Sequence, residues 1–471
     1  MRAVVSSAIS RRSLLVGAAS ATIAASLPGA AESSQTAAEF RLVAAPARWP
    51  IVGKPYPDTD AWCYDGRVPG PQIRLRQGEP VRITVENALA DDTTVHWHGI
   101  RLPIAMDGVP GLTQPPIRPG ESFTYEFTPP DAGTFWYHPH ANSLQQLGRG
   151  MAGALIVEEL EAVPVDRDIL WLLSDWRLTS DAQIAAGFGN PMEAAMSGRV
   201  GNTVTVNGAV SNEVPVRAGE RIRLRLINGA LARIMALRFE GHRPVVVAID
   251  GQPCDPHEPE RGRLLLGPAM RIDVVVDMQG EPGRRYRVVD DFYDGLSYWL
   301  TQFAYEDKPP VRPRPLEGSP ALPRNPLPEP DLANADRHEL KLQGGMMGGA
   351  GMGAMGMSYG ATWAINGHSM TGDGHAGMAP LVTLHLGRSY ILTVRNDTAF
   401  WRPVHFHGHS FRVLGRNGSP VPHRQWADTV LLPPKETIDV AFVADNPGDW
   451  MLHCHVTDHQ VSGLMTVLRV A

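Results

Sequence analysis

Alternating apolar and polar residues recur in three stretches of the chain, at 81–87, 222–228 and 390–396. Side chains two apart in a strand share a face, so this alternation predicts β-strands with one face in a core and the other in solvent. Each stretch follows a short apolar run and a glycine, and each ends in an asparagine after the same number of residues. The glycines are Gly78, Gly219 and Gly387, and the asparagines are Asn87, Asn228 and Asn396.

A unit repeated three times predicts an all-β chain of three similar antiparallel domains, each a sandwich or barrel. We place these domains at 40–160, 165–306 and 336–471. The segment 307–335 between the second and the third is rich in proline, which is typical of a stiff, extended connector. Such a connector is long enough for the third domain to fold back onto the first.

A second low-complexity segment, 344–357, alternates glycine with methionine. Thioether sulfur is a soft ligand that prefers Cu(I), so the segment is a candidate Cu(I) contact. The alternative is a flexible loop in which the methionines have no role.

Composition narrows the function classes. The chain has 47 glycines and 41 prolines, which favours short strands and turns, and its net charge is −6. The absence of a large basic block argues against nucleic acid as a partner. Of the three cysteines, Cys63 and Cys254 could form a disulfide in an oxidising compartment, but two buried free thiols are the favoured interpretation.

Residues 1–31 have the features of a signal peptide. Arg11 and Arg12 precede an apolar run from Val16 to Leu27, and small residues follow. The arginine pair predicts the twin-arginine export machinery, and the alternative is an ordinary signal peptide. No other segment has the length to span a bilayer, so we expect a soluble mature protein that is periplasmic or secreted.

The candidate chemistry lies in the histidines. Four His-x-His pairs occur, two after the first repeat and two after the third, and the middle domain has none. The step from Asn87 to the first pair equals the step from Asn396 to the third. The pairs are His96 and His98, His138 and His140, His405 and His407, and His453 and His455.

Residues two apart on a strand point to one face, so four such pairs present eight imidazoles from two surfaces. Imidazole suits copper and zinc, and eight ligands exceed what one tetrahedral ion uses, so several metals are expected between the first and third domains. Cys454 lies between His453 and His455 and must face the opposite way. With His459 it suggests a second, blue-copper site for electron transfer, which zinc does not explain.

At these residues the chain resembles the multicopper oxidases, a family that includes laccases, bilirubin oxidases and cuprous oxidases. The resemblance covers nearly all of the chain after the signal peptide and implies three cupredoxin-like Greek-key domains. It implies that Asp107 is the acid that assists proton delivery, and that Cys454 and His459 bind a type 1 copper. In the three-copper cluster it assigns His96 and His405 to the type 2 copper, and His98, His138, His140, His407, His453 and His455 to the type 3 pair.

Two positions depart from the family pattern. Arg402 stands where a type 1 ligand histidine is usual, and Leu464 stands at the axial position. Arginine is protonated and has no lone pair for a metal. Met465, His409 or a water could replace the missing ligand, or the site could be empty, and we favour a weakened or absent type 1 copper. Arg402 could pair with an acid such as Asp428 or lie across the pocket.

The resemblance implies an enzyme that oxidises a phenol, an aromatic amine or Cu(I) by single electrons and reduces dioxygen to water. We expect a monomer. Two alternatives stay open. One is a copper-binding, copper-tolerance protein with little turnover, and the other is a degenerate structural paralogue.

Overall fold

The computed structural model describes residues 37–471 except 211–212, 315, 319, 347–361 and 374. The predicted signal peptide and most of the Met-rich segment therefore lie outside the described residues. The described chain is almost entirely β, and none of its helices has the length and apolar character needed to cross a membrane. The helices are η1 (Ile104–Met106), α1 (Ser143–Gly148), α2 (Pro191–Ala195), η2 (Glu260–Gly262) and α4 (Thr457–Val461).

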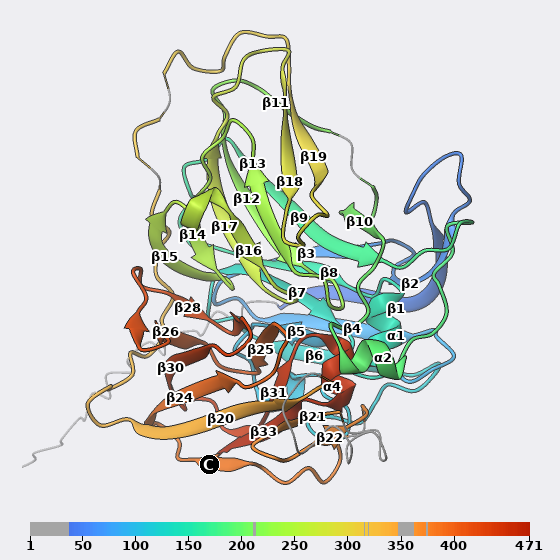
Figure 1. Cartoon of the computed structure of the whole chain (residues 1–471), viewed down its shortest axis with the longest axis vertical. Helices are drawn as coiled ribbons and strands as arrows, with labels where there is room; N and C mark the ends of the chain where they lie inside the picture. The colour runs from blue at the N-terminus through green and yellow to red at the C-terminus, as the bar shows by residue number, and fades with distance from the viewer. Residues whose placement is uncertain (1–36, 211–212, 315, 319, 347–361, 374) are drawn as a thin grey trace, which may run out of the picture. The chain divides into compact units, whose positions relative to one another are not determined.

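The first strands form two four-stranded sheets that enclose a core (Figure 1). They are β1 (Ala38–Trp49), β2 (Thr59–Tyr64), β3 (Gly70–Arg76), β4 (Val81–Asn87), β5 (His96–His98), β6 (Ser122–Phe127), β7 (Gly133–His138) and β8 (Gly153–Glu158). The strand orders are β2-β1-β4-β6 and β3-β8-β7-β5. Trp97 of one sheet meets Tyr125 of the other at 5.3 Å between ring centroids, so the sheets pack face to face.

The middle of the chain forms a six-stranded and a five-stranded sheet. Their strands are β9 (Arg167–Trp176), β10 (Thr203–Val206), β11 (Val214–Val216), β12 (Arg221–Asn228), β13 (Met235–Phe239), β14 (Val245–Ile249), β15 (Gln252–His257), β16 (Leu264–Leu266), β17 (Arg271–Asp277), β18 (Arg285–Asp290) and β19 (Tyr298–Tyr305). The orders are β10-β9-β12-β17-β14-β15 and β11-β19-β18-β13-β16. Stacked rings of Trp171, Phe239 and Phe303 fill the space between the two sheets.

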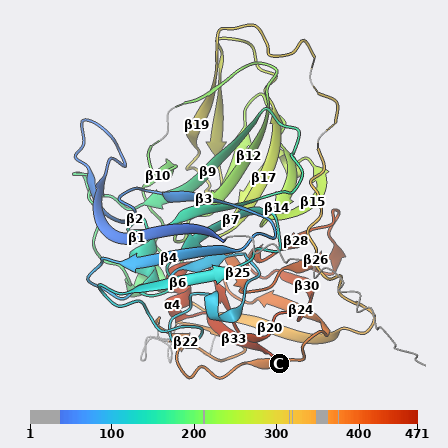
Figure 2. The same ribbon diagram turned by 180° about the vertical axis from the view of Figure 1, so that it is seen from behind.

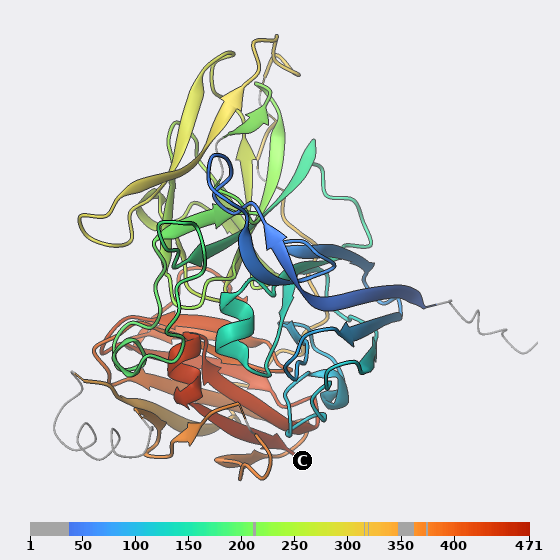
Figure 3. The same cartoon turned by 90° about the vertical axis from the view of Figure 1, so that its right-hand side faces the viewer.

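No helix or strand occurs among the described residues of 307–335, and the last sheets begin after it. Their strands are β20 (Asp336–Gly344), β21 (Trp363–Ile365), β22 (Met370–Thr371), β23 (Val382–Leu384), β24 (Ser389–Asn396), β25 (Arg402–Phe406), β26 (Phe411–Arg416), β27 (Ser419–Pro420), β28 (Trp426–Ala427), β29 (Thr429–Leu432), β30 (Thr437–Val443), β31 (Gly448–Cys454), β32 (Ser462–Gly463) and β33 (Met465–Val470). One sheet runs β21-β20-β24-β30-β26-β27 with β28 beside β26, another runs β23-β33-β31-β25-β29, and β22 pairs with β32. Figures 2 and 3 show these sheets from behind and from the side, and in Figure 3 α4 lies beside α1.

The predicted strands of the three repeats are confirmed as β4, β12 and β24. The expectation of purely antiparallel sheets is wrong, because β4 runs parallel to β1, β12 to β9 and β24 to β20. In the first copy β2 pairs with β1 whereas β3 joins the opposite sheet, so the chain crosses between the sheets before β4 and returns in the direction of β1. Alternation along a strand indicates its two faces but not its neighbours.

The outer face of β12 is not in solvent as its alternation predicts, because all of its residues are buried. Arg223 pairs with Asp273 and Glu159, and Arg225 pairs with Asp168, so this polar face is covered by paired charges. Cys63 and Cys254 are buried free thiols, as favoured from the sequence.

Candidate metal centre

The four histidine pairs come from two pairs of neighbouring strands. β5 pairs with β7 so that His96 lies opposite His138, and β25 pairs with β31 so that His405 lies opposite His453. His140, His407 and His455 follow directly after these strands or their last turn. All eight rings are at most 3% exposed, so the surroundings of the site are dry.

The two strand pairs face each other and bring the eight histidines together. His96 stacks on His407 with 4.0 Å between ring centroids, and His98 stacks on His405 at 3.7 Å. Their ring nitrogens form overlapping groups that could each hold an ion: His96, His138 and His140; His96, His98 and His405; His98, His138 and His455; His140, His407 and His453.

The outer ring nitrogens are occupied by acceptors. Nδ1 of His96 lies 2.8 Å from the Asp107 carbonyl, and Nδ1 of His453 lies 3.1 Å from the Cys454 carbonyl. A carbonyl can only accept, so each Nδ1 carries the ring proton and each Nε2 keeps a lone pair. The same holds for Nδ1 of His407, which donates to the Asp107 carboxylate at 2.9 Å.

The inner nitrogens point at one another without protons to share. Nε2 of His407 and Nε2 of His453 are 3.1 Å apart, although both rings carry their proton on Nδ1. Two facing lone pairs repel, and a cation bound by them removes the repulsion. Nε2 of His96, Nε2 of His405 and both ring nitrogens of His140 are buried without a hydrogen-bond partner among the described residues. One nitrogen of the neutral His140 ring carries a proton, and the lone pairs on the other nitrogens fit a group of copper ions.

Electrostatics favour the neutral rings that metals require. Burial, reinforced by neighbouring imidazoles, lowers the pKa of His138, His140 and His407 well below its ordinary value. The rings are therefore neutral at physiological pH, and metal binding needs no prior loss of a charge from them.

Asp107 lies beside two of the eight histidines. It follows η1 and is 1% exposed, with its carboxylate 3.3 Å from Nδ1 of His96 and 2.9 Å from Nδ1 of His407. The next residue, Gly108, has φ +84°, and a Cβ there would stand 1.9 Å from the Val95 carbonyl. Only glycine lets this turn approach the start of β5 closely enough.

Cys454 faces away from the eight histidines. Its sulfur lies 3.8 Å from Nδ1 of His459, which belongs to α4. Nε2 of His459 donates to the Met196 carbonyl at 2.9 Å, so Nδ1 holds the lone pair of this ring. Cys454 and His459 are thus close enough to bind the same metal ion.

The guanidinium of Arg402 lies beside Cys454 and His459, where such an ion would bind. Val404 pairs with Cys454 across β25 and β31, and Arg402, two residues earlier, lies on the same face. Its charged group lies 3.8 Å over the Trp363 ring, donates from Nε to the Thr398 hydroxyl at 3.1 Å and donates to Nδ1 of His459. Burial lowers the pKa of Arg402 to about 10, which leaves it charged at neutral pH.

The residues present therefore do not fit a type 1 copper. The His459 lone pair already accepts from Arg402, and Leu464, to which the resemblance assigns the axial ligand position, is buried and offers no ligand atom. Met465 lies opposite His453 and packs with Val109 and Met451, on the other face of β31 from Cys454. His409 stacks on Phe406. Of the two arrangements open for Arg402, the structure has the one beside Cys454 and His459 and not the ion pair with Asp428.

Sequence reasoning missed two residues beside the rings. Asp428 and Thr429, at the start of β29, both contact His98 and His405. Asp428 is paired with Arg271 of β17 and not with Arg402. The available signal was an acidic residue between two short apolar strands, β28 and β29.

Comparisons with known proteins agree with this geometry. Three family models, each described as multicopper oxidase, match residues 49–162, 167–297 and 355–471. A multicopper oxidase of Mycobacterium tuberculosis is 31% identical over 91% of this chain and 86% of its own length. Copper resistance protein A of Escherichia coli is 26% identical over 94% of each chain.

Solved structures give the same result. A multi-copper oxidase from Pseudomonas thermotolerans superposes with a TM-score of 0.82 and 36% identity, over 93% of this chain and all (100%) of that one. A Campylobacter jejuni multicopper oxidase described as a metallo-oxidase has a TM-score of 0.76 and 26% identity, over 93% of each chain. The fold is thus the cupredoxin-like fold of these enzymes. The chain belongs to the multicopper oxidase family and is a copper-dependent oxidoreductase that uses dioxygen as its electron acceptor.

Proposed function

We propose that this chain holds a three-copper cluster on its eight histidines and reduces dioxygen to water there, while Arg402 closes the type 1 position. The observation that carries the proposal is the set of inward, unprotonated nitrogens, of which Nε2 of His407 and Nε2 of His453 stand 3.1 Å apart. Copper, when bound, supplies the one-electron steps of a four-electron reduction. Eight imidazoles exceed the needs of one ion, which supports a cluster.

The chain's own residues orient the rings and exclude water. Backbone carbonyls hold the outer proton of His96 and His453, which directs the opposite nitrogen inward. The Asp107 carboxylate accepts from His407 and lies beside His96, so it is the group positioned to hold or pass a proton at the cluster. Burial of all eight rings keeps bulk solvent away.

For the electron donor we propose a phenol, an aromatic amine or Cu(I). Three methionines with exposed fractions of 53%, 42% and 48% lie at and beside α2, namely Met192, Met196 and Met346. The backbone N–H of Met346 donates to Ala195, and the Met196 carbonyl accepts from His459. Soft thioethers near His459, the ring that Arg402 contacts, favour Cu(I) as the electron donor. The names of two relatives, a copper resistance protein and a metallo-oxidase, agree.

The test is a copper count followed by oxygen uptake. We expect three copper ions per chain and dioxygen consumption with a phenol or with Cu(I). His455→Ala removes a cluster ligand and should abolish uptake, whereas His338→Ala, in a half-exposed part of β20, should leave it unchanged. Copper-loaded protein that consumes no dioxygen with any of these donors contradicts the oxidase.

A second candidate is a copper-tolerance protein with little turnover. The observation that favours it is Arg402, because a guanidinium beside Cys454 leaves no metal to pass electrons to the cluster. Such a protein binds copper with little oxygen uptake, and deletion of 344–357 should remove most of its Cu(I) binding.

We also propose export through the twin-arginine route to the periplasm or the medium, and a monomeric mature chain. Replacement of Arg11 and Arg12 by lysine should leave the protein inside the cell. Light scattering of the exported protein measures its mass, and a dimer would contradict the second part.

A further inference from the structure

Arg271 comes from the middle sheets, which supply no histidine to the site. It is the first residue of β17 and is 0% exposed. Its guanidinium makes a two-pronged ion pair with Asp428, at 2.8 Å to Oδ1 and 2.5 Å to Oδ2. Its Nε donates to the Thr134 carbonyl of β7 at 3.2 Å. One side chain therefore contacts both strand systems that carry the histidines.

Asp428 and its neighbour hold two of the rings. Oδ1 of Asp428 lies 3.3 Å from Nε2 of His98 and 3.3 Å from Nδ1 of His405, and the Asp428 backbone carbonyl also accepts from that Nδ1, at 3.0 Å. The Thr429 hydroxyl donates to the same carboxylate at 2.7 Å and lies 3.3 and 3.2 Å from those nitrogens. With the outer protons held here, Nδ1 of His98 and Nε2 of His405 are the nitrogens left for a metal.

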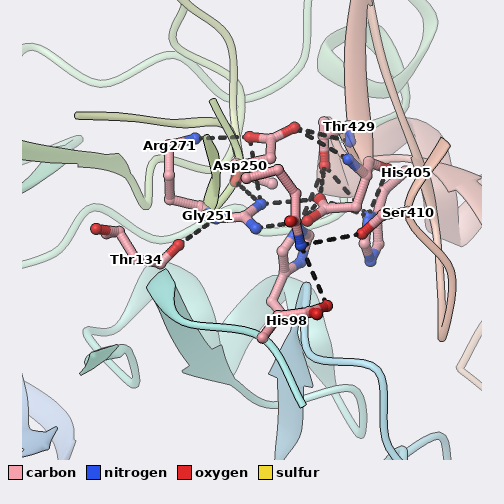
Figure 4. A network of polar contacts seen from close by, with 12 residues as sticks. His98, Thr134, Asp250, Gly251, Arg271, His405, Ser410 and Thr429 are labelled. Carbon is pink, nitrogen blue, oxygen red and sulfur yellow. Dashed lines mark hydrogen bonds and ion pairs between the residues drawn. The ribbon is translucent and has the colours of Figure 1, made fainter. Parts of the chain in front are cut away.

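A second carboxylate, that of Asp250, holds the backbone around this ion pair in place. Asp250 accepts from the backbone N–H groups of Asp428 and Thr429 at 3.2 and 3.0 Å and from the backbone of Arg271 at 2.9 Å. Figure 4 shows Arg271, Asp250, Thr429 and His405 joined in one network. Asp250 thus holds the backbone on both sides of the Arg271–Asp428 ion pair.

The backbone of β5 is shaped to this ion pair. A Cβ at Gly99, directly after His98, would stand 2.2 Å from the Arg271 guanidinium and 2.5 Å from the Asp428 carboxylate. The glycine of the sequence His96-Trp97-His98-Gly99 therefore leaves room for the pair against the strand that carries two ligands.

We infer that Arg271 is a positioning residue for the copper cluster: through Asp428 and Thr429 it fixes which nitrogen of His98 and of His405 faces the metal. This inference rests on the proposed cluster. It gives the middle domain a part in the site, although that domain contributes no ligand.

The experiment uses the full mature chain loaded with Cu(II), and it compares Arg271→Gln, Arg271→Lys and Thr429→Val with the unmodified protein. We measure copper retained against a chelator and the electron paramagnetic resonance spectrum of the type 2 copper. Loss of such a supporting partner typically weakens metal binding roughly 10- to 100-fold. We expect that loss and an altered spectrum for Arg271→Gln, with partial recovery in Arg271→Lys, which keeps the charge but only one prong.

Arg223→Gln is the matched control, because Arg223 is equally buried and paired, with Asp273 and Glu159, but contacts neither Asp428 nor a histidine among the described residues. It should lower the melting temperature while copper retention and the spectrum stay unchanged. The inference is overturned if Arg271→Gln retains copper with an unchanged spectrum, or if Arg223→Gln changes both equally. Should Arg271→Gln not fold, unchanged spectra in both Arg271→Lys and Thr429→Val overturn it. Failure of the unmodified chain to bind three coppers would instead contradict the proposed function.

Discussion

At the scale of single residues, Arg402 distinguishes this chain from the family pattern. Its guanidinium is fully buried, and no carboxylate pairs with it among the described residues. Its contacts are instead Trp363, Thr398 and His459, with the Cys454 sulfur beside them. A fixed organic cation thus lies where a metal cation would share Cys454 and His459.

Arg402→His should convert this position into a metal site. The shorter imidazole frees the lone pair of His459 and adds a third ligand, so we expect one more copper per chain and an intense blue absorption band. Visible spectroscopy and a copper count measure both. Arg402→Gln, which removes the charge without adding a comparable ligand, is the control and should stay colourless. An intense blue band in the unmodified protein would mean that Arg402 moves aside.

The sequence alone showed that an arginine stands at position 402 in place of the usual histidine, but not which way its side chain points. An arginine at this position can reach either an acid or the pocket, and Asp428 was a reasonable partner. The partner of Asp428 in the structure is Arg271, which is 157 residues away in the chain. Arg271 alternates with apolar residues as a solvent-facing residue would, so only the packing of the sheets reveals its role.

At the scale of elements, the asparagine that closes each repeat has one structural role in all three copies. Its side-chain oxygen accepts from the N–H two residues on, and its amide donates to carbonyls of the turn and of a facing segment. This holds for Asn87, Asn228 and Asn396. All three are at most 2% exposed, so each of these asparagines is a buried residue whose hydrogen bonds link the end of a strand to the turn that follows.

Asn228→Ala tests this role in the middle sheets, which supply no histidine to the site. The change leaves two buried carbonyls and one N–H without partners, which should lower the free energy of unfolding by about 2–3 kcal/mol. Denaturant unfolding measures it. Asn334→Ala, an exposed asparagine that donates to Asp331, should cost less than about 0.5 kcal/mol. Equal losses of unfolding free energy in the two variants would contradict this structural role of Asn228.

Gly99→Ala tests the close approach of β5 to the Arg271 ion pair. Gly99 has φ +86°, and a methyl group there meets both charged groups. Gly78 is the matched control, because its φ is +77° but nothing lies within 4 Å of a built Cβ. Gly78→Ala should cost only the backbone term, about 1–2 kcal/mol, and Gly99→Ala a further ~1–3 kcal/mol from overpacking. Unfolding midpoints that fall equally would show that the ion pair can move.

At the scale of the whole molecule, the proposed cluster connects strands from the two ends of the described chain. β5, β7 and the turn after β7 contribute half of the histidines, and β25, β31 and the turns after them contribute the rest. Without a cation the inner nitrogens repel, and with one they hold the two strand systems together.

Copper removal should therefore destabilise the fold unevenly. A ligand that binds only the folded state, at 1,000 times its dissociation constant, adds about 4 kcal/mol of stability. We expect the chelated protein to melt at a lower temperature and to exchange amide hydrogens faster in β5, β7, β25 and β31. β18 and β19 of the middle domain are the internal control and should change little. Identical melting with and without copper would contradict the prediction.

Much of the fold and site could be predicted from the sequence because their signals are local. Alternation indicates a strand wherever it occurs, and His-x-His on a strand places two rings on one face. The parallel pairing of β1 with β4 and the buried outer face of β12 were not predictable, because both depend on which strands become neighbours. The same applies to Asp428, whose partners come from three different sheets.

The enclosure of the eight rings has a kinetic consequence. With every ring at most 3% exposed, a chelator in solution cannot reach an ion between them while the strands stay closed. Release must then wait for a local opening, so its rate should level off as the chelator concentration rises. The metal content of a purified sample would accordingly reflect the copper available while the chain folded, rather than the copper in the surrounding buffer.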